Sequence, residues 1–504
     1  MAGYTHASDT FDTDSAPALD KSRGMHHTAA QPVAVRARWS RKVAADIVGF
    51  GDMIIIIAAL LIPCLLLTTL VDQFPRRLEL VRSGLLACLV AYPCFNHWQL
   101  YDTRRMSAFP VRPDRIMMAT AIAMIAVIGI SIPVGATAST IMITWPLIWF
   151  CAASAMLIFY RATVRDLFAS LAKSNYFDER IAVYGVGKIA ERVEHYIREA
   201  GDGQRFIGAF DDRADDERIE DQVLPAVGQL GDLIRAGRDG RVDRIIVALP
   251  QAADGRLAEI KRDLEQLPVT VHAVTHFSND LLTESSSHKV TSLGPVGLIN
   301  VKERPLSDWS PILKRVEDIV ISASLLLLTL PLLVAIAILI KLTSRGPVLF
   351  RQRRHGLNQK VIEVLKFRSM TVQENGHDVR QATQNDQRVT WIGRILRRSS
   401  LDELPQLVNV LVGEMSLVGP RPHALIHNEK WGEMLEQYAN RHQVKPGITG
   451  LAQVRGLRGE AHTPADIQNR ITADLEYIGN WSLWLDLSIL VRTISAVISA
   501  KNAH

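Results

Sequence analysis

The sequence predicts a multidomain membrane protein in three parts. These are a four-helix transmembrane region, an α/β Rossmann-like middle domain, and a C-terminal α/β domain with a re-entrant membrane helix. The mean hydropathy is +0.10 although 22% of the residues are charged, which indicates very apolar segments joined to soluble ones. In the middle of the chain, short strand-like runs alternate with amphipathic helical patterns. A length of 504 residues also exceeds that of one ordinary domain.

Residues 1–43 are mostly polar and aperiodic, and they are expected to form a disordered cytoplasmic tail. Residues 44–165 then hold four apolar stretches, each close to the ~20 residues that span a bilayer. Arginine and lysine residues precede the first stretch. Others lie in the loop between the second and third stretches, and others follow the fourth. By the positive-inside bias, the N-terminus and everything after Arg161 face the cytoplasm. The stretches are 45–70, 81–100, 115–134 and 141–160.

A fifth apolar run lies within residues 316–341, and basic residues flank it at both ends. Basic flanks on both sides hold both ends of a helix on the same face of the membrane. Pro331 stands near the middle, where it removes a helical hydrogen bond. We therefore expect a helix that enters the membrane, bends at Leu330–Pro331 and returns. The alternative is an ordinary kinked span, which would export the C-terminal domain.

Strand–helix alternation over residues 175–275 predicts a parallel sheet with crossover helices. Gly185 and Gly187 open the first helix with the spacing of a nucleotide-binding turn, and Asp211 and Asp212 end the next strand. The glycines could instead serve only a tight turn and close packing, and a regulatory or assembly role for the domain is favoured over a bound nucleotide. Residues 276–311 are interpreted as a connector, part of which could pair with the sheet.

Residues 312–504 carry two adjacent carboxylates, Asp402 and Glu403, next to an apolar helical pattern. Capping-box spacing starts this helix at Ser400, whereas Pro405 favours a start at Asp402. Either start places both carboxylates at the positive end of a helix, where phosphate also binds. An ionised Asp402 there could attack phosphorus, and Glu403 could hold Mg²⁺.

Cations near these carboxylates would neutralise phosphate charge. Taken alone, an Asp-Glu pair is more often a plain helix cap with exposed charges. Rigid turns at 419–422 and 445–450 that present cations favour a phosphate-handling site instead. The candidate phosphate-binding residues are Arg397, Arg421, Lys366 and Arg368.

Four motifs resemble the bacterial sugar transferases, the long-form polyprenol-phosphate phosphoglycosyl transferases, most closely the undecaprenyl-phosphate glucose phosphotransferase type. The motifs are KFRSM at 366–370, LDELPQLVNVL at 401–411, GEMSLVGPRP at 413–422 and KPGITGLAQV at 445–454. The resemblance covers nearly the whole chain and makes the C-terminal domain catalytic. One departure is Leu330–Pro331, because this family often has a Ser-Pro pair at the kink.

The resemblance implies a two-step transfer through a phosphosugar bound to Asp402. UDP-sugar would release UMP, and undecaprenyl phosphate would then take the sugar phosphate, which initiates exopolysaccharide or capsule synthesis. Glu403 would hold Mg²⁺, Arg397 and Arg421 would position phosphates, and Lys366, Arg368 and Gln453 would contact substrate. Glucose is the sugar that the resemblance favours; galactose or an N-acetylhexosamine for O-antigen remains open.

The implied partners are therefore a UDP-sugar, undecaprenyl phosphate and membrane lipid, at the cytoplasmic face of the bacterial inner membrane. A homodimer is left open. A net charge of +5 is small for this length and gives no reason to expect nucleic-acid binding. The rival functions are a lipid-linked sugar transporter or flippase, and a membrane-anchored nucleotide sensor. Against a transporter, we expect no charged residue deep in the four N-terminal stretches.

Overall fold

The computed structural model describes residues 40–63, 77–101, 111–131, 140–174, 176–200, 203–212, 223–249, 254–274, 290–293, 296–371, 387–423, 431, 435–457 and 463–498. The polar tail expected at the N-terminus lies outside these residues as far as position 39. The first helix begins at Arg41, slightly before the expected boundary.

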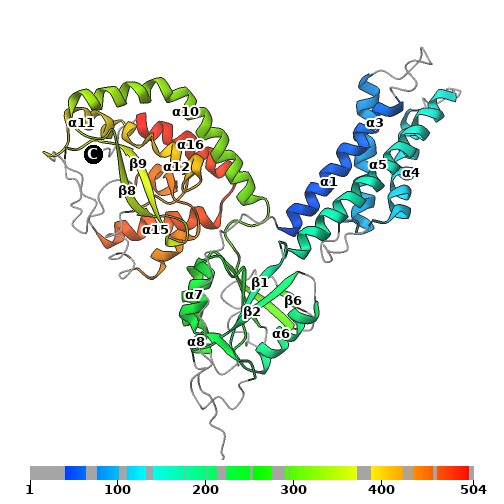
Figure 1. Ribbon diagram of the computed structural model, residues 1–504, viewed down its shortest axis with the longest axis horizontal. Coiled ribbons are helices and arrows are strands. Elements are labelled where there is room, and N and C mark those ends of the chain that lie inside the picture. The colour runs from blue at the N-terminus through cyan, green and yellow to red at the C-terminus, as the bar shows by residue number, and fades with distance from the viewer. Residues whose placement is uncertain are drawn as a thin grey trace, which may run out of the picture. The chain divides into compact units, whose positions relative to one another are not determined.

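Each of the four apolar stretches near the N-terminus contains a helix (Figure 1). The helices share one apolar core, to which Ala87, Ala119 and Trp149 contribute fully buried side chains. Two described segments, Arg41–Pro63 and Thr144–Leu171, are long and apolar enough to cross a membrane. The spanning of all four therefore stays a prediction. The helices are α1 (Arg41–Ala58), α3 (Arg77–His97), α4 (Pro113–Ser131) and α5 (Thr140–Lys173).

A buried ion pair joins α1 to α5. The Arg161 Nη2 and Asp52 Oδ2 atoms lie 2.5 Å apart, and both side chains are fully buried. Arg161 also donates to the Leu100 carbonyl, and the Tyr101 hydroxyl donates to Asp52. The expectation of no charged residue inside the four stretches is therefore wrong for Asp52. The contacts of Asp52 described here are with Arg161 on α5 and with Tyr101 just after α3, so the pair joins neighbouring segments of the helical region.

The middle domain is built on a sheet whose first five strands run parallel in the order β3-β2-β1-β4-β5, as the alternating pattern predicted. Helix α6 packs on one face of this sheet, and α7 and α8 pack on the other (Figure 1). The strands are β1 (Glu179–Tyr184), β2 (Gln204–Phe210), β3 (Ala226–Gly228), β4 (Arg244–Val247) and β5 (Thr270–Val274). The helices are α6 (Lys188–Ala200), α7 (Leu230–Arg238) and α8 (Asp254–Glu265).

Two further strands extend the same sheet beyond position 275. Strand β7 (Val296–Lys302) pairs antiparallel with β5, and β6 (Val290–Leu293) pairs antiparallel with β7. The segment interpreted as a connector therefore contributes to the sheet through Lys302, which was the alternative left open.

The turn after β1 requires its first glycine. Gly185 has a φ of +120°, and an added Cβ would lie 2.4 Å from the Ala248 carbonyl oxygen. Both the backbone conformation and the close approach of β4 thus exclude a side chain. Asp212, near the expected ribose-binding position, already accepts hydrogen bonds from Tyr184, Leu230 and Arg256. Gly185 thus serves close packing at the turn, and the Asp212 carboxylate ties the end of β2 to β1 and to α7.

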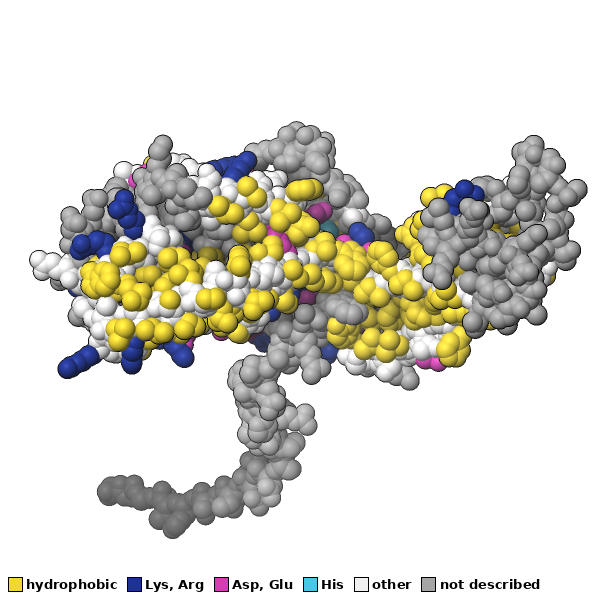
Figure 2. Space-filling view, turned by 90° about the horizontal axis from the view of Figure 1, so that it is seen from above, with side chains coloured by type: hydrophobic (Ala, Val, Ile, Leu, Met, Phe, Trp, Pro, Cys, Tyr) yellow, Lys and Arg dark blue, Asp and Glu magenta, His cyan; other side chains and the backbone are white. Residues whose placement is uncertain are grey.

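The long helix α10 (Ser310–Thr343) leads into the C-terminal domain. It stays helical through Pro331 and follows a bent course (Figure 1). Its side chains are largely exposed; Leu327 and Leu328 expose more than seven-tenths of their surface. The face of the molecule that carries α10 is correspondingly rich in hydrophobic side chains (Figure 2). With 34 residues and a mean hydropathy of 2.8 over its most apolar window, α10 is the third helix among the described residues that is long and apolar enough to cross a membrane.

The C-terminal domain packs helices around a β-hairpin and a two-stranded parallel sheet. Its core includes Val364 of the hairpin, Val410 and Leu417. The strands are β8 (Leu349–His355), β9 (Val361–Phe367), β10 (Ser416–Val418) and β11 (Gly447–Thr449). The helices are α11 (Trp391–Arg398), α12 (Gln406–Val412), α14 (Leu451–Val454), α15 (Pro464–Gly479) and α16 (Leu483–Ile498), with 3₁₀ turns η3 (Leu357–Gln359), η4 (Leu401–Glu403) and η5 (Glu436–Gln443).

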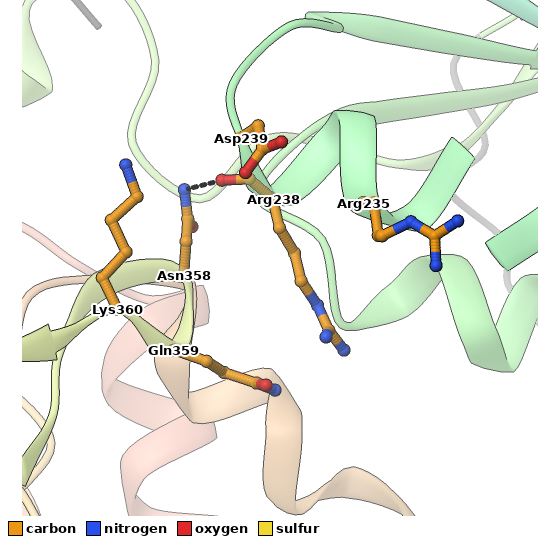
Figure 3. A pocket seen from close by; sticks show the side chains of 6 residues that line it. All are labelled: Arg235, Arg238, Asp239, Asn358, Gln359 and Lys360. Atoms are coloured by element: carbon orange, nitrogen blue, oxygen red, sulfur yellow. Dashed lines mark hydrogen bonds between the residues drawn. The ribbon is translucent and has the colours of Figure 1, made fainter. Parts of the chain in front are cut away.

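The tip of the β8–β9 hairpin borders a small polar pocket. Asn358 Nδ2 donates to the Arg238 carbonyl over 2.8 Å at the end of α7 (Figure 3). Asn358 has a φ of +56°, a conformation that asparagine tolerates better than most residues. The remaining lining side chains are polar or charged: Arg235, Asp239, Gln359 and Lys360.

Candidate active site

Asp402 and Glu403 lie on η4, between α11 and α12. Ser400, directly before this turn, has a φ of +57°, in the left-handed region that non-glycine residues seldom adopt. Helix α12 begins only at Gln406, with Pro405 in the position before it. Both expected helix starts were therefore too early. The carboxylates lie on a separate 3₁₀ turn and not on the first turn of α12.

Glu403 is buried and contacts two cations from different parts of the domain. Lys366 Nζ, on β9, lies 3.1 Å from Glu403 Oε1. Arg421, after β10, donates from Nη2 to Oε1 over 2.6 Å and from Nη1 to Oε2 over 3.2 Å. A charge-assisted set of this kind fixes the Glu403 carboxylate in one orientation beside Asp402.

Asn409 holds strand β9 against α12. Its Oδ1 accepts from the Leu365 backbone N–H over 3.0 Å, and its Nδ2 donates to the Glu363 carbonyl over 2.7 Å. Asn409 is almost completely buried, so both backbone groups depend on it. Since Lys366 follows directly on this strand, the asparagine sets the position of the lysine relative to η4.

The electrostatics of the site follow from burial among opposite charges. Burial raises the pKa of the Asp402 carboxyl, and Lys366 opposes this rise. Burial lowers the pKa of the Lys366 ammonium, against the influence of Glu403. The Glu403 carboxylate raises the pKa of Arg421. The site thus holds a carboxylate whose charged form is poorly solvated, which favours nucleophilic reactivity.

The other predicted residues do not all reach the carboxylates. Arg397 lies in the last turn of α11, and its charge lowers the pKa of Asp402. Arg368 instead donates to the carbonyls of Ser344 and Arg345 over 2.8 Å each, just after α10. These contacts give Arg368 a structural role at the end of that helix.

Gln453, on α14, donates from Nε2 to the Ile448 carbonyl over 3.2 Å. Its Oε1 atom is buried and has no hydrogen-bond partner within the described part of the chain. That acceptor is therefore available to a donor group of a substrate.

Two arginines that the sequence analysis did not single out also belong to this region. Arg354, on β8, donates to the Pro422 carbonyl, and Arg441, on η5, donates to the Arg421 carbonyl over 2.6 Å. Arg354 stands in a run of basic residues, RQRRHG, in which nothing distinguishes one arginine from the next. Arg441 lies outside the four motifs, which end before it or start after it.

The residues present fit Mg²⁺ only together with substrate oxygens. Among the described residues, no group of three or more His, Cys, Asp or Glu side chains gathers to hold a metal ion. Magnesium in phosphate chemistry commonly uses one or two carboxylates and completes its coordination with phosphates and water. Glu403 is the carboxylate that would supply this contact.

Comparison with known proteins places this site in a family. The bacterial sugar transferase family matches residues 309–500, and a CoA-binding domain matches residues 98–275. A UDP-glucose:undecaprenyl-phosphate glucose-1-phosphate transferase of Klebsiella pneumoniae is 39% identical over 71% of this chain and 76% of that protein. The protein of the same name from Escherichia coli K12 is 40% identical over 71% of this chain and 76% of its own length.

Two further relatives align over a smaller share of this chain, and one of them is named for a different sugar. A glucose-1-phosphate transferase of Caulobacter vibrioides is 53% identical over 38% of this chain and 72% of that protein. A UDP-N-acetylgalactosamine-undecaprenyl-phosphate N-acetylgalactosaminephosphotransferase of Aeromonas hydrophila is 38% identical over 42% of this chain and 51% of that protein. With the motif resemblance thus confirmed, the chain belongs to the bacterial sugar transferase family.

Proposed function

We propose that this protein transfers glucose 1-phosphate from UDP-glucose to undecaprenyl phosphate, with release of UMP. The relatives named for this reaction align over most of the chain. The observation that carries the proposal is the Asp402–Glu403 pair, in which Lys366 and Arg421 fix the glutamate beside a poorly solvated aspartate. This combination suits reaction with an anionic diphosphate.

The proposed first step is attack by an Asp402 carboxylate oxygen on the sugar-bearing phosphorus of UDP-glucose. A bond forms between that oxygen and phosphorus, and the bond from phosphorus to the bridging oxygen breaks, so UMP leaves with the electron pair. In the second step an oxygen of undecaprenyl phosphate attacks the same phosphorus. The aspartyl bond breaks, the Asp402 carboxylate is restored, and a lipid diphosphate sugar is formed.

Charge neutralisation is the main demand of the first step, because an anion attacks an anion. Arg421 and Lys366 already lie at the glutamate and can turn spare N–H donors toward the phosphates. Glu403 would hold Mg²⁺, which neutralises phosphate charge when it is bound. Arg397 adds positive charge from α11.

The test is UMP release by purified full-length protein in detergent, with UDP-glucose and undecaprenyl phosphate. Enzyme quenched after mixing with donor alone should show a hexose phosphate adduct on the peptide that contains Asp402. UMP release without any adduct would contradict the covalent step but leave the transfer intact. A parallel screen with UDP-galactose and UDP-N-acetylhexosamines tests the sugar, since one relative is named for N-acetylgalactosamine. A transporter or nucleotide sensor would release no UMP.

We further propose that the protein lies in the bacterial inner membrane with its C-terminal domain on the cytoplasmic face, and that α10 is re-entrant. Support comes from basic flanks at both ends of α10, from Pro331 within it and from its exposed leucines. Cysteines placed at the exposed positions Leu313 and Leu342, in a chain with its native cysteines replaced, would test this. Both should react with an impermeant thiol reagent only in inverted vesicles. A spanning helix would label from opposite sides.

A further inference from the structure

Arg441 is a buried arginine that fixes the backbone of the turn carrying Arg421. Its exposed fraction is 2%, and its Nη2 atom donates to the Arg421 carbonyl over 2.6 Å. The same nitrogen lies 2.8 Å from Asp474 Oδ2 on α15, in an ion pair with both side chains buried. Its Nη1 atom donates to the Tyr438 hydroxyl over 3.3 Å and also contacts His423. Groups on helix α15 and on η5 thus hold the Arg441 guanidinium against the turn that carries Arg421.

Arg354 fixes the same turn at the next residue. Its Nη1 atom donates to the Pro422 carbonyl, while Nε and Nη2 both donate to Gln352 Oε1 over 3.1 and 2.7 Å. Gln352 lies on the same strand, two positions earlier, so the guanidinium is oriented by its own hairpin. The carbonyls of two consecutive residues are therefore held by arginines of two different elements. Arg441 of η5 donates to the Arg421 carbonyl, and Arg354 of β8 donates to the Pro422 carbonyl.

This arrangement is electrostatically costly, which argues against a purely structural purpose. Burial and the neighbouring Arg421 lower the pKa of Arg354 to about 10. His423, at the end of the turn, is kept neutral because burial and Arg441 hold its pKa well below the usual value. Backbone hydrogen bonds already tie the turn to β11, since Gly419 donates to the Thr449 carbonyl and Gly447 donates to the Pro420 carbonyl. Arg441 is paired with Asp474, whereas the hydrogen bonds of Arg354 described here go to neutral oxygens. Burial of Arg354 beside Arg421 therefore weakens folding unless an anion joins it.

We propose that Arg441 and Arg354 are positioning residues for the transfer reaction, which together hold the Arg421 side chain at the Glu403 carboxylate and at the incoming diphosphate. We call this pair the arginine clamp. The inference rests on the proposed function and extends it to two residues that do not contact Glu403 themselves. A displacement of about 1 Å at such a contact can cost roughly 100-fold in rate.

Arg441→Lys tests the clamp while it retains the positive charge. A lysine cannot donate along the several directions that Arg441 uses toward the Arg421 carbonyl, Asp474 and Tyr438. The rate of the first turnover with UDP-glucose alone should fall about 100-fold. The amplitude of that turnover, which counts the enzyme molecules able to react, should stay at the wild-type level. Arg354→Lys should behave in the same way.

Arg455→Lys is the matched control. Arg455 makes a two-point ion pair with Glu476, also on α15, but this pair is half exposed. Its substitution should leave both rate and amplitude unchanged.

The outcomes separate the two proposals. Wild-type protein that forms no adduct and releases no UMP refutes the proposed function and the clamp with it. Active wild-type protein, with Arg441→Lys and Arg354→Lys at normal rate, refutes the clamp alone. A fall in amplitude with an unchanged rate would also refute it, because that result is the signature of lost folding. Where Arg441→Lys does not fold, Arg354→Lys decides.

Discussion

Arg421 and Glu403 form a two-point ion pair, with N–O distances of 2.6 and 3.2 Å between the terminal nitrogens and the two carboxylate oxygens. Lys366 contacts the same carboxylate over 3.1 Å. The acid next to Asp402 is thus neutralised before any substrate arrives. Substrate phosphates, and the proposed Mg²⁺, would therefore have to share or replace these contacts, so the cations that meet the phosphates are already in place before substrate binds.

Asp402→Asn should reduce turnover at least about 1000-fold, because an amide cannot attack phosphorus. The thermal unfolding temperature should stay equal or rise, since burial already raises the pKa of this carboxyl and so disfavours its charged form. Single-turnover UMP release and thermal denaturation in the same detergent measure both effects. Near-normal turnover in this variant would remove Asp402 from the role of nucleophile.

The pH range in which the first half-reaction is active should be narrower than the range set by an aspartate and a lysine with ordinary pKa values. Asp402 must be ionised to attack, and its raised pKa moves the loss of activity on acidification to a pH above its ordinary 3.8. Lys366 must be protonated to neutralise phosphate, and its lowered pKa moves the alkaline loss to a pH below 10.5. Measuring the second-order rate constant of the first turnover with UDP-glucose alone avoids titration of the lipid phosphate.

Lys366→Arg assigns the alkaline limb of that profile. A guanidinium stays protonated throughout the range, so the alkaline limb should move to higher pH while the acid limb stays in place. An alkaline limb that does not move would assign it to another group.

Asn409→Leu should destabilise the catalytic domain by roughly 2 to 4 kcal/mol, because the Leu365 N–H and the Glu363 carbonyl lose a buried partner. Asn480→Leu is the control: Asn480 is exposed at the end of α15, and its loss should change the unfolding free energy by less than about 0.5 kcal/mol. Thermal melts of both variants in detergent compare them. Equal melts would show that Asn409 does not hold β9.

Arg368→Gln should lower thermal stability and leave the KM for UDP-glucose unchanged, because the guanidinium contacts the carbonyls that follow α10. Arg421→Gln is the comparison, and it should impair the reaction because that side chain contacts Glu403. A raised KM with unchanged stability in Arg368→Gln would restore the phosphate-binding role that the sequence motif implied.

Removal of residues 1–165 should leave a catalytic fragment that still requires detergent. Leu327, Leu328 and Leu342 on α10, and Trp484 on α16, expose most of their side chains. Gel filtration with and without detergent measures this. A monodisperse fragment in plain buffer would argue against membrane contact by α10.

The local chemistry of this protein was readable from sequence because it depends on residue type and short spacing. The Asp402–Glu403 pair, the rigid turn at Arg421 and the alternation that builds the five parallel strands are all local patterns. The sequence indicated that Lys366 belongs to the site only because it lies in a family motif. Its position beside Glu403 depends on Asn409, which lies far along the chain and holds strand β9. Arg368 shows the limit: β9 ends at Phe367, so strand alternation no longer governs the next side chain.

By itself, the sequence determined which groups are available: two carboxylates, a set of cations, and apolar helices with basic flanks. Tertiary structure alone decided which cations meet the carboxylates, that the carboxylates lie on a 3₁₀ turn ahead of α12, and that Arg354 and Arg441 reach adjacent carbonyls. The reason is that hydrogen bonds and ion pairs act over about 3 Å, whereas residues 354, 421 and 441 come together only when the hairpin, the turn after β10 and η5 pack against one another.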